Sequence, residues 1–135
     1  MAGLASRKEV AKRYIALLEA GDMEAIIDLF ADDGTVQSPI YGKQSAGDFY
    51  RQLAADTRQS QLHIRDLFES AEKAQLALYF EYIWTLRSGQ IVRFEVVDIL
   101  KFDEENKIQT LTIIYDTVQS RQLVQELSFR SRSIF

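Results

Sequence analysis

The spacing of apolar residues changes once along the chain, near residue 56, and this change restricts the possible folds more than any other feature of the sequence. On its N-terminal side, apolar residues recur at helical spacing and predict three helices, over residues 6–20, 23–30 and 45–54. On its C-terminal side, alternating β-branched and aromatic residues predict four strands, over residues 61–70, 74–86, 91–102 and 107–115. Helices first and a meander of strands afterwards indicate an α+β fold with an antiparallel sheet.

Local signals mark several ends of these elements. Ser6 and Glu9 match the capping box that begins a helix, and Gly21 is typical of a helix C-terminus. Residues 31–34 have the composition of a turn. Residues 35–38 then predict a short extended segment, which stops at a proline.

The length of 135 residues predicts a single domain spanning residues 1–135. Residues 119–126 have the pattern of a terminal helix. We expect residues 128–135 to form a flexible tail, because chain ends are poorly ordered unless they dock on the domain.

Charge and composition exclude several classes of function. A net charge of −4 without a basic block argues against a nucleic-acid partner. No apolar run approaches the ~20 residues that a membrane span needs, and the charged start differs from a signal peptide, so we expect a cytoplasmic protein without a membrane partner. Because the chain has no cysteine and His63 is its only histidine, we expect no disulfide, no metal and no cofactor.

Asp98 is the polar residue whose position in the pattern is most informative. Along its predicted strand it alternates with apolar side chains, those of Phe94, Val96, Leu100 and Phe102, so its carboxyl group should lie on the buried face. Burying a carboxylate is costly unless it is paired or neutral. The sequence therefore leaves two interpretations, a structural partner for Asp98 or a protonated acid that donates a hydrogen bond inside a pocket.

The opposite face of the same strand mixes apolar and charged residues, namely Ile91, Arg93, Glu95, Val97 and Ile99. A mixed face of this kind is partly wet or is used in a dimer. We expect a homodimer formed through this outer sheet face, with Arg93 and Glu95 in cross-strand or intersubunit ion pairs.

Three short motifs stand out: AGD at residues 20–22, LFADD at residues 29–33 and VDILKF at residues 97–102. With the order of elements, they resemble the NTF2-like superfamily, and more closely its ketosteroid isomerases and SnoaL-like proteins, over residues 8–118. The resemblance implies a cone-shaped domain, in which N-terminal helices pack on a curved antiparallel sheet and enclose an apolar pocket.

The resemblance also implies a set of catalytic positions. Its isomerases use an aspartate before a proline as the base, and a tyrosine and a protonated aspartic acid as hydrogen-bond donors to the forming enolate. Tyr14 matches the tyrosine and Asp98 matches the acid, whereas the base position before Pro39 holds Ser38. A serine without a neighbouring histidine or lysine does not remove a carbon-bound proton near neutral pH.

The pocket wall is expected to consist of aromatic and apolar side chains. The strand alternation and the resemblance together predict six ligand-binding residues: Phe30, Tyr50, Phe80, Tyr82, Val96 and Tyr115. His63 lies on a predicted strand, where a lone histidine is usually structural.

Three functions fit these residues. The first is binding of a small hydrophobic carbonyl- or phenol-type ligand, with isomerase- or cyclase-like chemistry that lacks the usual aspartate base. The second is a non-catalytic ligand-binding or dimerisation module. The third is a hydrolase of the epoxide-hydrolase type. In it either Arg93 and Glu95 would form a catalytic pair, or Asp98 or Asp116 would position a water molecule.

Overall fold

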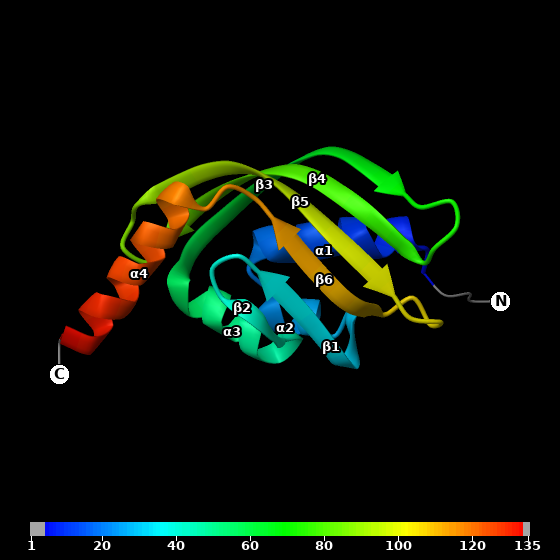
Figure 1. Cartoon of the computed structure of the whole chain (residues 1–135), viewed down its shortest axis with the longest axis horizontal. Helices are drawn as coiled ribbons and strands as arrows, with labels where there is room; N and C mark the ends of the chain where they lie inside the picture. Colours follow the sequence, from blue (N-terminus) through cyan, green and yellow to red (C-terminus); the bar gives the residue numbers. More distant parts are fainter. Residues whose placement is uncertain (1–4, 134–135) are drawn as a thin grey trace.

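The computed structural model describes residues 5–133 and contains a curved six-stranded sheet with three helices under its concave face (Figure 1). Along the chain the elements are α1 (Arg7–Ala20), α2 (Met23–Ile27), β1 (Phe30–Ser38), β2 (Gly42–Ser45), α3 (Ala46–Asp56), β3 (Thr57–Glu69), β4 (Gln75–Leu86), β5 (Ile91–Phe102), β6 (Ile108–Ile114) and α4 (Val118–Ser133). The strands lie in the order β2-β1-β6-β5-β4-β3. The β1–β6 pair is parallel and the other four pairs are antiparallel, so the predicted α+β class is confirmed.

Helix α1 begins and ends where its capping residues indicate. The Ser6 Oγ accepts a hydrogen bond from the Glu9 backbone N–H at 3.1 Å, and Gly21 adopts a φ of 76° just after the last turn. Glycine enters this left-handed conformation without a steric penalty, which stops the helix there. The apolar face of α1 packs on β3 and β4, and it buries Tyr14 and Leu18 among others.

The second helix is shorter than predicted. Helix α2 ends at Ile27, whereas the apolar spacing predicted a helix as far as residue 30. Phe30 instead begins β1, where it lies opposite Ile108 of β6. A partner strand from the far end of the chain therefore outweighs the local helical pattern.

Residues 31–34 were expected to form a turn, but they belong to β1. They interrupt its pairing with β6, since the register shifts between Phe30 and Thr35. Gly34 permits this irregular region, because a Cβ there would lie only 2.9 Å from the carbonyl oxygen of Ile108. The short strand β2 was not predicted, because its sequence GKQS has none of the residue types that favour strands.

The long strands match their predictions closely, with one exception at the start of β3. Strand β3 begins at Thr57, directly after α3, rather than at residue 61. Residues 57–60 are polar, so they gave no strand signal, yet Gln59 and Ser60 pair with Thr85 and Trp84 of β4. Pairing with a strongly apolar neighbour draws this segment into the sheet.

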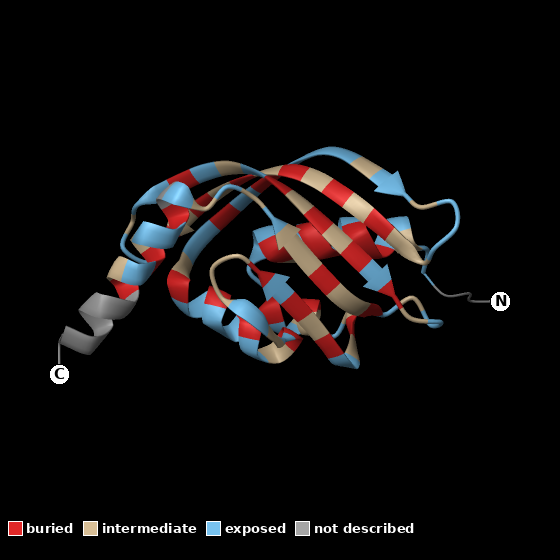
Figure 2. Ribbon diagram, in the orientation of Figure 1, coloured by how far each residue is buried: buried red, intermediate tan, exposed pale blue. Residues whose placement is uncertain are grey.

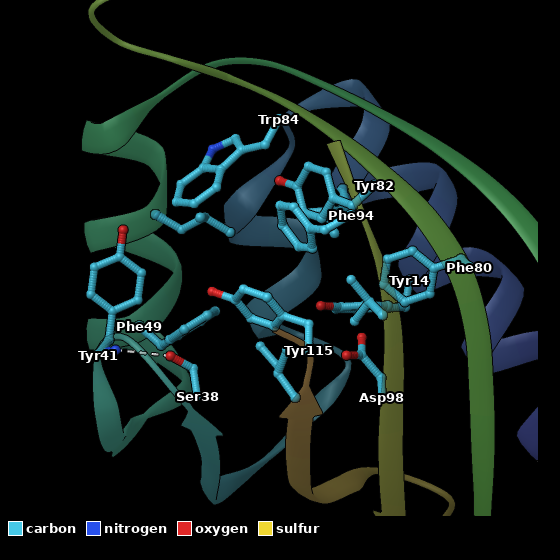
Figure 3. Close-up of a pocket in the computed structure, with 14 residues that line it drawn as sticks. Tyr14, Ser38, Tyr41, Phe49, Phe80, Tyr82, Trp84, Phe94, Asp98 and Tyr115 are labelled. Carbon is cyan, nitrogen blue, oxygen red and sulfur yellow. Dashed lines mark hydrogen bonds between the residues drawn. The ribbon is translucent and has the colours of Figure 1, made fainter. Parts of the chain in front are cut away.

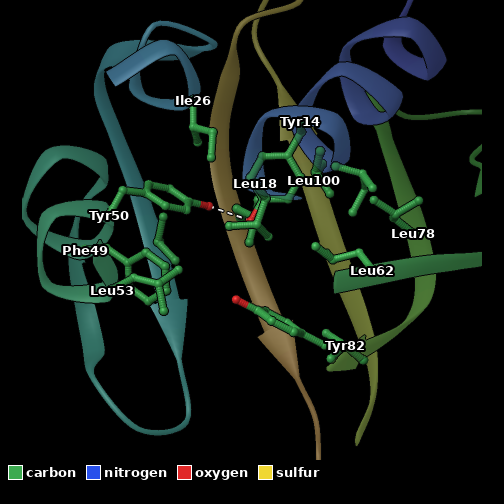
Figure 4. Close-up of a cluster of buried hydrophobic side chains, with 14 of the residues drawn as sticks. Tyr14, Leu18, Ile26, Phe49, Tyr50, Leu53, Leu62, Leu78, Tyr82 and Leu100 are labelled. Atoms are coloured by element: carbon green, nitrogen blue, oxygen red, sulfur yellow. Dashed lines mark hydrogen bonds between the residues drawn. The ribbon is translucent and has the colours of Figure 1, made fainter. Parts of the chain in front are cut away.

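The alternation along the strands separates a buried inner face from an outer face (Figure 2). Every second residue of β4 is buried, and these are Leu76, Leu78, Phe80, Tyr82, Trp84 and Leu86. Strand β5 adds Val96, Asp98, Leu100 and Phe102 to the same face, as its pattern predicts. These side chains meet those of α1 and α3 in one core (Figure 4).

The outer face carries an ion-pair network centred on Arg65. Its guanidinium lies 3.2 Å from the Glu95 carboxylate and 3.7 Å from that of Glu81, reaching from β3 across β4 to β5. Arg93 and Glu95 were expected to form cross-strand or intersubunit ion pairs. Within one chain Glu95 pairs with Arg65, whereas Arg93 forms no ion pair among the described residues. Because Arg65 and Glu95 are exposed to solvent, these pairs contribute little to stability.

Helix α4 continues well beyond the predicted residues 119–126. Its backbone includes residues 128–133 of the expected tail, whereas residues 134–135 lie outside the described residues, and the flexible tail stays a prediction. Val124 and Leu127 of α4 are buried against the domain. Within residues 5–133, no helix is both long and apolar enough to cross a membrane.

Candidate functional site

A small cavity lies between the inner face of the sheet and helices α1 and α3 (Figure 3). Its volume is about 40 Å³. Fourteen residues line it: Tyr14, Leu18, Ser38, Tyr41, Phe49, Leu53, Phe80, Tyr82, Trp84, Phe94, Val96, Asp98, Ile113 and Tyr115. The three predicted catalytic positions, at residues 14, 38 and 98, therefore meet at one cavity although they come from three different elements.

Asp98 has an unusual environment for a carboxyl group. It is 1% exposed, and its Oδ1 atom has no hydrogen-bond partner among the described residues. Burial raises the pKa of Asp98 well above the ordinary value of an aspartate, because the charged form cannot be hydrated there. The carboxyl group therefore favours its neutral form, in which it can donate a hydrogen bond.

Tyr14 projects from α1 towards the same part of the cavity (Figure 3). Its hydroxyl oxygen lies 2.7 Å from the hydroxyl oxygen of Tyr50 on α3, and one of the two groups donates to the other (Figure 4). Burial is the main cause that raises the pKa of both phenols well above 10. When Tyr50 donates, the Tyr14 proton remains available to a ligand oxygen.

The base position has a structural role in this chain. Ser38 is buried at the end of β1, and its Oγ accepts a hydrogen bond from the Tyr41 backbone N–H at 2.9 Å. This bond closes the turn that connects β1 to β2. No histidine, lysine or arginine is among the lining residues that the structure describes, so nothing beside Ser38 activates its hydroxyl.

Aromatic rings form most of the wall around these polar groups. Phe94 stacks on Tyr115 with ring centroids 4.5 Å apart, and on Tyr82 with centroids 5.4 Å apart. The Tyr82 hydroxyl lies 2.7 Å from the Ser60 Oγ, and burial raises the pKa of Tyr82 well above 10. Because its polar end is already paired, Tyr82 presents only its ring to the cavity.

Four of the six predicted ligand-binding residues line this cavity: Phe80, Tyr82, Val96 and Tyr115. Tyr50 and Phe30 do not. Tyr50 lies behind Tyr14, and the Phe30 ring packs on Tyr50 with centroids 5.7 Å apart. Both belong to the core beneath the cavity. Their place depends on how closely α3 packs against α1 and β1, which the spacing of apolar residues does not show.

Other lining residues were left out of the predicted ligand-binding set. Strict alternation places Trp84 on the inner face of β4 and Phe94 on the face of β5 that carries Asp98, and both line the cavity. Phe49 could not be identified in this way, because its place on the wall depends on how α3 packs. His63 is exposed on β3 and does not line the cavity.

The cavity suits a very small ligand in this conformation. A volume of about 40 Å³ holds a few water molecules, whereas pockets for drug-sized ligands are roughly 300–1,000 Å³. Within residues 5–133, no group of three or more His, Cys, Asp or Glu side chains is placed to hold a metal ion. The site therefore offers hydrogen-bond donors and ring faces to an organic molecule.

Three solved structures share this architecture at low sequence identity. An NTF2-like protein of unknown function from Cytophaga hutchinsonii matches with a TM-score of 0.70 and 12% identity, over 87% of this chain and 96% of that one. A hypothetical protein with a ketosteroid isomerase-like fold from Catenulispora acidiphila, solved with trimethylamine, matches with a TM-score of 0.70 and 15% identity, over 80% of this chain and 85% of that one. SalBIII, an epoxide hydrolase/cyclase-like enzyme of pyran ring formation in salinomycin, matches with a TM-score of 0.72 and 16% identity, over 82% of this chain and 90% of that one.

At such identities these likenesses establish the NTF2-like fold and leave the activity open. The family is established separately, because the family model described as a SnoaL-like domain matches residues 11–110, most of the chain. The fold implied by the sequence motifs is therefore confirmed: this chain belongs to the family of SnoaL-like domains.

Proposed function

We propose that the cavity binds a small hydrophobic carbonyl- or phenol-type molecule, with Asp98 and Tyr14 as hydrogen-bond donors to its oxygen. The observation that carries the proposal is the buried Asp98 Oδ1 without a protein partner. A buried polar group left unpaired costs about 1–3 kcal/mol, and a ligand that bonds to the Asp98 carboxyl would recover part of this free energy. Tyr14 adds a second donor from the facing helix.

The donor pair favours chemistry in which negative charge develops on the ligand oxygen. Neutral donors in a buried cavity stabilise an enolate or phenolate more strongly than they do in water. Ketosteroid isomerases combine such a donor pair with an aspartate base, and here the base position holds Ser38. The proposed function is therefore ligand binding, with proton transfer weak or absent in the natural chain.

Fluorescence titration with phenol tests this proposal, because Trp84 is the only tryptophan and lines the cavity. Asp98→Asn should keep phenol affinity within about threefold, since the amide still donates, and Asp98→Leu should weaken binding about tenfold or more. Asp32→Asn, an exposed change outside the cavity, is the control and should bind like the natural chain. Unchanged affinity in Asp98→Leu would remove Asp98 from the proposed site.

A small alkylammonium ion is a second candidate ligand. One structural relative was solved with trimethylamine, and ring faces such as those of Trp84 and Tyr82 attract cations. An ammonium ligand would require the ionised form of Asp98, so Asp98→Asn should abolish its binding while phenol binding survives. Titration with trimethylammonium chloride therefore distinguishes the two candidates by the response of one variant.

We also propose that the outer sheet face forms a homodimer. Phe68, Ile91 and Ile114 are 56%, 60% and 53% exposed, and Val97 lies opposite Ile114 on the same face. A second copy would remove these apolar groups from water.

Sedimentation at micromolar concentration should show a dimer, and Val97→Glu should shift it to monomer. The matched change Val118→Glu, on the exposed start of α4, should leave the dimer intact, and a natural chain that sediments only as monomer contradicts the proposal.

A further inference from the structure

Partial exposure marks where the cavity meets solvent. Ten of the fourteen lining residues are buried, and the four that are partly exposed are Tyr41, Phe94, Ile113 and Tyr115. Tyr41 belongs to the turn between β1 and β2, whereas the other three belong to β5 and to the end of β6 and the residue after it. The entrance therefore lies between this turn, residues 39–41, and the β5–β6 side of the sheet.

Side-chain hydrogen bonds hold the turn in place. The Tyr41 hydroxyl donates to the Asp56 carboxylate at 2.5 Å, and the Gln52 side chain approaches the same oxygen at 3.4 Å. The Tyr41 backbone N–H donates to Ser38, as described above. Residues 39–41 lie outside the strands, so these bonds rather than ladder pairing fix the turn.

Burying the Asp56 carboxylate at this position costs free energy. Asp56 is 5% exposed and sits at the C-terminal end of α3, where the helix dipole disfavours a negative charge. Its contact with Tyr41 compensates for part of this cost. Asp56 is therefore the buried acceptor that holds the Tyr41 side chain, and with it the turn, in place.

Helix α4 reaches the turn from the other side of the entrance. The Arg121 guanidinium donates a hydrogen bond to the carbonyl oxygen of Pro39. Helix α4 begins shortly after Tyr115, which is itself part of the entrance. The Arg121 contact thus connects the two sides across the opening.

We propose that residues 39–41 and the start of α4 form a gate, which the Tyr41–Asp56 and Arg121–Pro39 hydrogen bonds keep closed and which opens to admit a ligand. The cavity of about 40 Å³ is too small for phenol or a cyclic ketone, so a ligand of the proposed class enters only if the wall moves. The gate rests on the proposed function for its purpose, but its opening can be measured without any ligand.

Acrylamide quenching of Trp84 fluorescence measures opening directly, because Trp84 is 2% exposed when the gate is closed. Tyr41→Phe removes the hydroxyl that donates to Asp56, and Arg121→Ala removes the link from α4 at an exposed position. Each change should raise the quenching constant, by up to roughly tenfold if opening is a minor equilibrium, because losing one charge-assisted hydrogen bond shifts such an equilibrium by about that factor.

Arg51→Ala is the matched control. Like Arg121→Ala it removes an exposed arginine that donates a hydrogen bond, here to the Glu24 carboxylate at 3.2 Å, but Arg51 does not line the cavity. Its quenching constant should stay at the natural value. Quenching that is unchanged in both Arg121→Ala and Tyr41→Phe, or equally raised in Arg51→Ala, would overturn the gate. If the gate variants show raised quenching but the protein does not bind phenol, the proposed ligand is rejected and the gate remains supported.

Discussion

Asp98→Asn should make the protein more stable than the natural chain at neutral pH, and the difference should vanish near pH 4. The folded-state pKa of Asp98 is raised by burial, whereas in the unfolded chain it titrates near the ordinary value of about 4. Below that value Asp98 is protonated in both states. As the pH rises, the unfolded chain loses this proton and the folded chain keeps it, so the natural protein loses stability until the folded pKa is passed.

Each pH unit between the two pKa values costs the natural chain about 1.4 kcal/mol relative to Asp98→Asn. Urea unfolding of both proteins between pH 4 and pH 8 measures this difference directly. Asp32→Asn, which removes an exposed carboxylate, should follow the natural chain throughout. A natural chain that instead loses stability relative to Asp98→Asn as the pH falls towards 4 would mean that Asp98 is ionised and paired in the folded state.

Ser38→Asp should give the protein a ketone isomerase activity at least about 10²-fold above that of the natural chain, the usual contribution of a general base being roughly 10²–10⁴-fold. The introduced carboxylate can still accept the Tyr41 N–H bond, because aspartate forms the same kind of turn as serine. Its second oxygen would share the cavity with the donors Asp98 and Tyr14. The conversion of cyclohex-3-enone into its conjugated isomer, followed by absorbance, measures the rate.

Ser38→Asn is the matched control, because asparagine has the shape of aspartate and can accept the same Tyr41 N–H bond but has no basic group. It should remain as inactive as the natural chain. Adding Asp98→Leu to Ser38→Asp should lower the new activity again, because the forming enolate loses a donor. Robust isomerisation by the natural chain would show that another group is the base, and neither His63 nor Asp116 lines the cavity to supply one.

The sequence alone determined the fold class and the faces of the strands. Alternation along a strand has a period of two, which local backbone geometry imposes, so the inner position of Asp98 followed from its apolar neighbours. Capping residues such as Ser6 and Gly21 act over three or four residues, so the sequence alone also predicted both ends of α1. The predictions failed where a distant partner decides the outcome, as for Phe30, which leaves its helical pattern to pair with Ile108.

Only the tertiary structure decided how the site is built. The Tyr14–Tyr50 contact joins residues 36 positions apart, and the Arg121–Pro39 contact joins residues 82 positions apart. Such pairs depend on how the helices pack on the sheet, which the spacing of apolar residues within one element does not specify. The volume of the cavity is likewise a small difference between large packed volumes, so shifts of a fraction of an ångström in the surrounding rings change it. The residue types at this site come from the sequence, and packing between distant segments decides which of them meet.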